Sequence, residues 1–264
     1  MRKALAIMRK DLKEVFSSRQ LIISIVVPAL VFGVILPIVF GLSFTAEDNS
    51  TEIGILNQTI YRYDGVVLRD SSEVIAYWMM NYMLPILLMV LPCGITCVVA
   101  ADSIAGEKER KTLEALLLMP VSNFELFIGK MLAPFVIGVV IASVSAIVSM
   151  AISSYFSISL LGKSFLNIST WAITILLLIP TVAFMAITFS VIVSVYAKGV
   201  REAQQMSGAI IVPIVIILIA SATNMAVFAG VSRILLALLF LLTGLIFSYV
   251  SSKLMDREKL ILRV

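Results

Sequence analysis

The stretch AYWMMNYMLPILLMVLPCGITCVVAA, residues 76–101, contains no Asp, Glu, Lys or Arg. An α-helix rises about 1.5 Å per residue, so about 20 apolar residues cross the roughly 30 Å hydrocarbon core of a bilayer. This stretch is therefore long and apolar enough to span a membrane as a helix. Similar blocks recur along the chain. The sequence predicts six transmembrane helices, at residues 21–44, 76–101, 131–153, 171–195, 209–226 and 234–251.

The composition of the whole chain agrees with a membrane protein. Of its 264 residues, 61% are hydrophobic and 14% are charged, whereas soluble domains have about 45–50% apolar and about 25% charged residues. This excludes a cytosolic enzyme, a disordered linker and a nucleic-acid-binding domain, so nucleic acid is not expected as a partner. The lack of histidine excludes imidazole-dependent sites, and two cysteines exclude a disulfide framework. We predict an all-α integral membrane protein.

The distribution of basic residues predicts the orientation of the spans. With both termini inside, the segments that face the cytosol are residues 1–20, 102–130, 196–208 and 252–264. They hold 16 of the 20 Lys and Arg residues, and the outer segments hold four, as the positive-inside rule expects. Trp78 and Trp171 fall at the outer ends of spans, where an interfacial aromatic belt is expected. We predict a multi-pass cell-membrane protein with cytoplasmic N- and C-termini.

The last two predicted spans are short, and the segment between them, residues 227–233, is mostly apolar. Ser221, Thr223 and Asn224 are able to end the fifth helix early. The segment would then be a re-entrant turn, which is stable at membrane depth only where protein covers it or water reaches it. The sequence leaves two full spans and a re-entrant hairpin both open.

Small residues and prolines within the spans indicate packing positions and kinks. Ser145, Ser149 and Ser153 repeat every four residues on the third span, which favours close helix packing over a polar pore lining. Cys93 and Cys97 share one face of the second span, and packing is preferred over metal binding because two thiols are too few for a typical site. The prolines that can kink the spans are Pro28, Pro37, Pro85, Pro92, Pro180 and Pro213.

Residues 1–20 have a helical pattern of apolar and basic residues, which predicts an amphipathic helix. Such a helix lies in the interface of the membrane and contacts anionic lipids, so membrane lipids are expected partners. It either anchors the first span or also contacts a protein partner. The apolar face is formed by Leu5, Met8, Leu12, Val15 and Phe16.

The outer loop, residues 45–75, is too short for an external α/β domain. Its segment EIGILN, residues 52–57, resembles the start of a strand. The motif N-x-[ST] at Asn49, Asn57 and Asn167 fits glycosylation acceptors in outer loops, and chance explains it equally well.

The longest inner loop, residues 102–130, begins with a helix-forming segment. The sequence SIAGEKERKTLEALLLM predicts a helix that runs from Ser103 to Met119. Opposite charges four residues apart stabilise such a helix. The expected ion pairs are Glu107–Lys111 and Arg110–Glu114.

A second helix follows at once. Pro120 ends the first helix, because proline lacks the N–H donor and clashes with the preceding turn. Ser122 and Glu125 form an S-x-x-E capping box, which starts a new helix. We predict two short coupling helices that meet at a rigid corner below the membrane, between spans two and three.

The run DSIAGEKERKTLEALLLMPVSNFELFIGKML, residues 102–132, resembles the signature of type-2 ABC transporter permeases, the membrane subunits of ATP-binding-cassette exporters. A weaker similarity lies in AKGVREAQQ, residues 197–205, in the next inner loop. The positions that match the longer signature are Glu107, Glu109, Arg110, Thr112, Leu113, Glu114, Leu116, Leu117, Pro120, Ser122, Glu125, Leu126, Gly129 and Lys130.

The resemblance implies six spans in a permease domain over residues 21–264, with an interfacial helix before it. It also implies a homodimer or heterodimer of permeases and a separate ABC ATPase subunit that binds ATP and Mg²⁺. No P-loop is expected in this chain: the nearest candidate, SISLLGKS at residues 157–164, has Ser157 in place of the first glycine and lies on the outer side. We therefore expect no cofactor, metal or catalytic residue here.

These features predict a permease that moves a substrate out of the cytosol when the ATPase acts on its inner loops. Ion-driven transporters usually carry a charged residue within a span, and the predicted spans have none. The alternative is a non-transporting membrane anchor or assembly subunit of an ATPase complex. The residues expected to contact the partner are Glu107, Glu109, Arg110, Thr112, Glu114, Pro120, Ser122, Glu125, Lys198, Arg201 and Glu202.

Overall fold

The computed structural model describes residues 2–45, 51–112, 122–223 and 228–254. In these ranges every regular element is a helix, and six helical runs are long and apolar enough to cross a membrane. The predictions of an all-α protein and of six spans are therefore confirmed.

Most of the spans are built from several consecutive helical segments. The first span comprises α2 (Arg19–Leu30), η1 (Val31–Ile35) and α3 (Leu36–Leu42), and the second comprises α5 (Ser71–Trp78), η3 (Met79–Met83), α6 (Leu84–Leu88) and α7 (Val90–Glu109). The third is α9 (Asn123–Leu161), and the fourth is α10 (Ile168–Ile173), η4 (Thr174–Leu178) and α11 (Ile179–Tyr196). The fifth is α12 (Val200–Ser207), η5 (Gly208–Ile210) and α13 (Ile211–Thr223), and the sixth is α14 (Ser232–Leu254). The remaining elements are α1 (Arg2–Ser17), η2 (Ser43–Thr45) and α4 (Thr51–Asp64).

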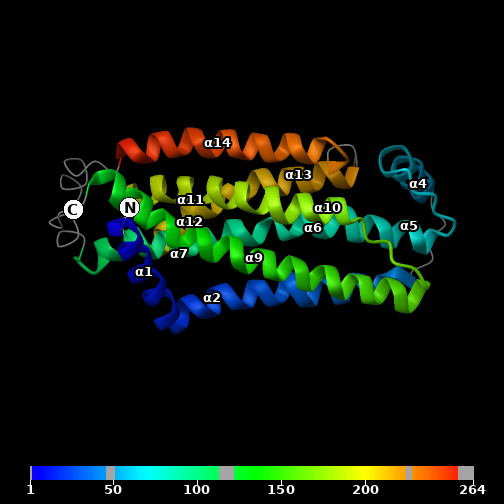
Figure 1. The fold of residues 1–264 in the computed structure, drawn as a ribbon, viewed down its shortest axis with the longest axis horizontal. Helices are drawn as coiled ribbons and strands as arrows, with labels where there is room; N and C mark the ends of the chain where they lie inside the picture. The colour runs from blue at the N-terminus through cyan, green and yellow to red at the C-terminus, as the bar shows by residue number, and fades with distance from the viewer. Residues whose placement is uncertain (1, 46–50, 113–121, 224–227, 255–264) are drawn as a thin grey trace.

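The spans lie side by side along one long axis (Figure 1). Helix α1 and the last turn of α14 lie at one end of this bundle, which we call the α1 end, and α4 lies at the opposite α4 end. Helices α7 and α11 pack against each other and are largely buried, whereas α2, α13 and α14 expose most of their apolar side chains. Exposed apolar side chains of this kind suit contact with lipid.

Three spans contain a π-helical turn, and each turn is followed by a proline. Segments η1, η3 and η4 each end two residues before a proline, at Pro37, Pro85 and Pro180. A proline has no N–H for the carbonyl four residues earlier and collides with it. A π-turn relieves that collision by widening the helix locally. Three of the six prolines expected to distort the spans thus have a visible effect on helix geometry.

The serine positions on the third span pack against the first span. Ser145, Ser149 and Ser153 are buried, and α9 contacts η1 and α3. A Cβ atom at Gly33 would lie only 3.1 Å from the Cβ of Ser145. This close approach confirms the packing interpretation of the serine stripe.

Helix α1 packs through buried residues of which only Val15 belongs to the expected apolar face. Ala4, Ile7 and Val15 are buried, whereas Leu5 and Phe16 are exposed. The contact surface is set by α9, which lies against α1, and not by the most apolar stripe. The exposed Leu5 and Phe16 leave an apolar surface available to lipid.

The expected strand in the outer loop is wrong, because residues 52–57 belong to helix α4. Ile53, Leu56 and Ile60 pack together with the bundle core. Their spacing of three and four residues matches one helix face and not a strand. The side-chain amide of Asn57 donates to the carbonyl of Leu68, 3.2 Å away.

A buried polar cluster joins α4 to the spans. The Arg233 side chain donates to the Phe228 carbonyl (2.7 Å) and to the Thr170 hydroxyl, and its guanidinium lies 4.0 Å from Asp64. Tyr82 donates to the same carboxylate at 2.7 Å. The cluster was not predicted.

One expectation near the α4 end is revised by the structure, and another is left open. Trp171 is 1% exposed, so it packs inside the bundle and does not form an interfacial belt. Helix α13 ends at Thr223, and Phe228 and Ala229 are buried before α14 begins. Residues 224–227 lie outside the described residues, so two full spans and a re-entrant hairpin both stay open.

Candidate functional site

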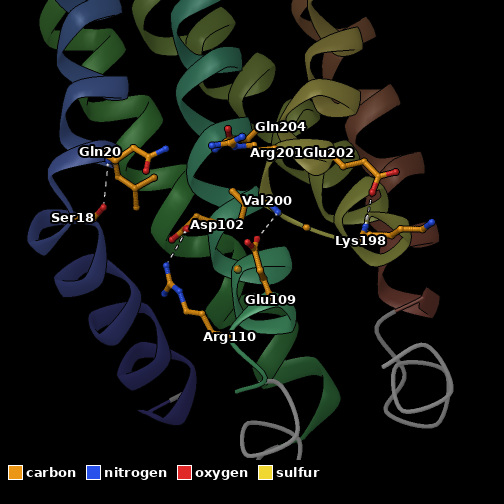
Figure 2. A pocket seen from close by; sticks show the side chains of 13 residues that line it. Ser18, Gln20, Asp102, Glu109, Arg110, Lys198, Val200, Arg201, Glu202 and Gln204 are labelled. Atoms are coloured by element: carbon orange, nitrogen blue, oxygen red, sulfur yellow. Dashed lines mark hydrogen bonds and ion pairs between the residues drawn. The ribbon is translucent and has the colours of Figure 1, made fainter.

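A polar cavity of about 930 Å³ lies at the α1 end of the bundle. Its walls come from the start of α2, the end of α7, and α12 with the residues just before it (Figure 2). Five predicted partner-contact residues line it, from two loops that are far apart in sequence. They are Glu109, Arg110, Lys198, Arg201 and Glu202.

The end of α7 corrects the expected helix. Instead of continuing to Met119, α7 ends at Glu109. Lys111 has a positive φ of 56°, and the Thr112 N–H donates to the Glu107 carbonyl at 2.9 Å. This is the hydrogen-bond pattern of a Schellman C-cap, which satisfies the last carbonyl groups of the helix.

The ion pair expected between Glu107 and Lys111 is not formed, because the helix ends before Lys111. Instead, Glu107 is 4% exposed and lies between two other cations. Its Oε1 is 2.8 Å from the Nζ of Lys130 and 2.8 Å from the Nζ of Lys10. Glu107 is therefore placed inside the protein and not on its surface.

Lys130 is the centre of this buried cluster. Its ammonium is 3.4 Å from Asp11 and donates to the Ser103 carbonyl at 2.9 Å. The Ser103 hydroxyl donates to Asp11 at 2.7 Å. The cluster joins α1, α7 and α9, so α1 is attached to the segment that carries the family-like signature.

The pKa values of the two α1 residues in this cluster, Lys10 and Asp11, are both raised. Burial raises the pKa of the Asp11 carboxyl, although the charge of Lys130 and the hydrogen bond from Ser103 oppose the shift. Burial also disfavours the Lys10 ammonium, but the hydrogen bond and charge of Glu107 outweigh it and raise the pKa of Lys10. Lys10 is therefore firmly protonated at neutral pH.

Hydrogen bonds join the end of α7 to the end of α11 and to the start of α12. The carboxylate of Glu109 accepts the N–H of Val200 at 3.1 Å (Figure 2). The ammonium of Lys108 donates to the Val195 carbonyl at 2.8 Å. Glu202 accepts the N–H of Lys198 at 2.7 Å. The two predicted contact regions thus form one connected surface.

Arg110, at the end of α7, links this helix to α1. It forms ion pairs with Glu14 on α1 and with Asp102 on α7, the latter at 3.2 Å. The expected partner Glu114 lies outside the described residues, as does Pro120.

The expected second coupling helix begins as predicted and continues into the third span. Ser122 caps α9, and Glu125 completes the capping box. The helix extends to Leu161, so in the described part of the chain the second coupling helix is the beginning of the third span and not a separate short helix. Ser122 and Glu125 are not among the residues that line the cavity.

Sequence reasoning missed part of this site. Gln20, Asp102 and Gln204 also line the cavity. Gln20 directly precedes the apolar block 21–44, and polar residues at such boundaries are a signal that could have identified them. Lys130 belonged to the matched signature, but its buried partners were not predicted.

Comparison with known proteins places nearly the whole chain in one family. Residues 5–258 match the family described as "ABC-2 family transporter protein". The chain belongs to the ABC-2 transporter family. It is also similar to the "ABC transporter permease protein NatB" of Bacillus subtilis (strain 168), with 31% identity over 149 residues. That match covers 55% of this chain and 38% of the relative, so it spans well under half of the relative's length.

The family-like signature at residues 102–132 is thereby confirmed as a sign of ABC-2 membership. This ABC-2 protein is a multi-pass transmembrane permease subunit of the ABC transporter class. Its buried charged residues Asp11, Glu107, Lys130, Glu73 and Arg233 lie toward the two ends of the bundle.

Proposed function

We propose that this chain is the permease subunit of an ABC exporter, and that a separate ATPase subunit docks on its α1 end. The observation that carries the proposal is the joining of two loop segments, at Glu109–Arg110 and Lys198–Glu202, around one cavity. This surface is polar and rich in charges of both signs, as protein docking sites at membrane surfaces often are. The excess of basic residues at this end supports a cytosolic location.

The helices offer a direct mechanical route from the α1 end into the membrane. Helix α7 runs unbroken from Val90 to Glu109, and α9 runs from Asn123 to Leu161. A push on their ends would therefore move whole spans as rigid bodies. The ATPase would supply ATP and Mg²⁺ binding, and two permeases, identical or different, would pair to form the pathway.

The docking step is tested by site-specific photo-crosslinking. A benzophenone amino acid replaces Glu202 at the α1 end, and in a matched control it replaces Tyr61, which is 61% exposed on α4. The chain is purified from its native membrane after illumination. We expect an ATPase subunit to crosslink at position 202 and not at position 61. Equal crosslinking at both positions, or none at position 202, contradicts the proposed docking surface.

Reconstitution in liposomes distinguishes an exporter from a non-transporting membrane anchor. The permease and its co-purified ATPase are placed in liposomes, and ATP turnover and efflux are measured with a panel of amphipathic compounds. Stimulated turnover together with ATP-dependent efflux supports an exporter. A stable complex that no compound stimulates, and that releases none, supports the anchor.

A further inference from the structure

We propose that the cavity at the α1 end binds the zwitterionic headgroup of an aminophospholipid, with phosphate at Arg201 and the ammonium at Glu109. This inference does not rest on the proposed function, because it concerns the isolated chain in a bilayer. It follows from the charges in the cavity, the polar groups left without partners, and the position of the cavity relative to the apolar blocks.

Most charges that line the cavity are already engaged within the protein. Arg110 pairs with Asp102, and Glu202 accepts the N–H of Lys198. By contrast, Arg201 forms no ion pair or hydrogen bond through its side chain with any residue that the structure describes. Two cations of the lining, Arg201 and Lys198, thus have side chains without a counter-charge among the described residues, and the Lys198 side chain points away from Arg201 (Figure 2).

Two amide side chains near Arg201 are also without partners. Gln204 lies one helical turn further along α12, and Gln20 lies on the opposite wall, at the start of α2 (Figure 2). Neither side-chain amide hydrogen bonds to the described part of the chain. One guanidinium and two amide donors suit the oxygens of a phosphate diester.

Glu109 supplies the opposite charge on the α7 wall. Its Oε2 atom accepts the Val200 N–H at 3.1 Å, which fixes the side chain, and its second oxygen is left to accept another donor. A primary ammonium has three N–H donors and meets this need, whereas a quaternary ammonium has none. The lining as a whole carries three acidic and three basic residues, Asp102, Glu109, Glu202, Arg110, Lys198 and Arg201. This balance favours a zwitterion over a purely anionic headgroup.

The cavity lies where lipid headgroups are expected. Gln20 directly precedes the apolar block 21–44, and Gln204 shortly precedes the block 209–226. Beyond the cavity, exposed side chains of α2 and α13 are apolar, as at Ile23 and Val212. A headgroup in the cavity could therefore keep its acyl chains against the surface of the bundle, in the hydrocarbon region that flanks the interface.

The test measures which lipids stay bound to the purified full chain. The protein is reconstituted with equal amounts of phosphatidylethanolamine, phosphatidylglycerol and phosphatidylcholine, extracted in mild detergent, and analysed by native mass spectrometry. We expect phosphatidylethanolamine to be retained about tenfold over the other two, the ratio typical of one charge-assisted hydrogen bond. Equal retention of the three lipids, or a preference for phosphatidylglycerol, overturns the proposal.

Single substitutions test which residues bind the phosphate of the headgroup and which residue binds its ammonium. Arg201→Gln should reduce retention of every phospholipid about tenfold, and Gln20→Leu on the other wall should weaken it in the same direction. Glu109→Gln should remove the preference for phosphatidylethanolamine over phosphatidylcholine and leave phosphate binding in place. Lys13→Gln, on the exposed face of α1, is the matched control and should change nothing. If Arg201→Gln and Gln20→Leu both retain lipid as the wild type does, the assignment is wrong.

A soluble headgroup distinguishes a lipid from a free phosphate ester. Glycerophosphoethanolamine at millimolar concentration should fail to displace the retained lipid, because it lacks the acyl chains. Complete displacement by this compound would make the ligand a water-soluble ester and overturn the lipid assignment. Loss of lipid only when the ATPase binds would show that the cavity is emptied by docking, and would support the headgroup site in the free permease.

Discussion

The Nζ atom of Lys130 lies 2.8 Å from Glu107 Oε1 and 3.4 Å from Asp11 Oδ2, and the three side chains are at most 5% exposed. One buried ammonium therefore balances two buried carboxylates that come from α1 and α7. Each carboxylate also keeps one oxygen without a hydrogen bond from the described residues. The charge balance of this buried cluster therefore depends strongly on Lys130.

Replacing Lys130 by methionine should destabilise the protein by about 3–5 kcal/mol, because it leaves two buried carboxylates without their shared counter-charge. The measurement is thermal or denaturant unfolding in detergent. Lys10→Met is the matched control: the Lys10 side chain is 52% exposed, so its loss should cost under about 1 kcal/mol. Adding Glu107→Gln to Lys130→Met should restore part of the lost stability, because it removes the charge of one unpaired carboxylate. Equal stability of the Lys130 and Lys10 variants contradicts the cluster.

Gly129 allows α1 to approach α9, and its substitution should separate them. A Cβ atom at Gly129 would lie 2.9 Å from the Cβ of Ile7 and 3.1 Å from the Ala4 carbonyl oxygen. Gly129→Ala should therefore cost about 1–3 kcal/mol through overpacking and speed trypsin cleavage within α1. Gly94→Ala is the control, because a Cβ there has no neighbour within 4 Å. Unchanged cleavage of α1 in Gly129→Ala would show that the helices adapt without separating.

Features that depend on local sequence were predictable. The spans follow from uncharged runs long enough to cross a bilayer. The start of α9 follows from the capping box of Ser122 and Glu125, which involves only neighbouring residues. Residues of two loops that line the cavity could be named because each loop carries its own family-like pattern, and their contact with a partner stays a prediction.

Features that depend on tertiary contacts were not predictable. Asp11 and Lys130 are far apart in sequence, and nothing local indicates that they meet. The end of α7 was misplaced because Lys111 in a left-handed conformation is unusual for a residue with a Cβ. Trp171 was expected at the lipid interface because tryptophan is common there, but its burial is decided by neighbouring helices.

The raised pKa of Asp11 predicts how stability responds to acid. Because the folded-state pKa lies above the ordinary value of 3.8, the folded state binds this proton more tightly than the unfolded chain does. The contribution of Asp11 to stability therefore grows as the pH falls through the raised pKa, and is complete below 3.8. Asp11→Asn should flatten the dependence of the melting temperature on pH between neutrality and that value. Lys13→Gln, the control, should leave the slope unchanged, and an unaltered slope in Asp11→Asn would contradict the assignment.

Arg233 and Asp64 form the corresponding buried pair at the α4 end, with side chains 2% and 6% exposed. Arg233→Met should cost about 3–5 kcal/mol, because among the described residues Asp64 then keeps only the hydroxyl donors of Tyr77 and Tyr82 in a buried site. Arg233→Lys should also destabilise, since an ammonium cannot reproduce the fork that reaches Phe228 and Thr170.

The double variant Arg233→Met with Asp64→Asn tests whether this cost comes from the unpaired carboxylate. If it does, the double variant should be more stable than Arg233→Met alone in the same unfolding measurement. Arg62→Met is the control on α4, where the side chain is exposed, and it should change stability by less than about 0.5 kcal/mol. Strictly additive losses in the double variant would show that the guanidinium acts through its contacts with Phe228 and Thr170 and not through its charge on Asp64.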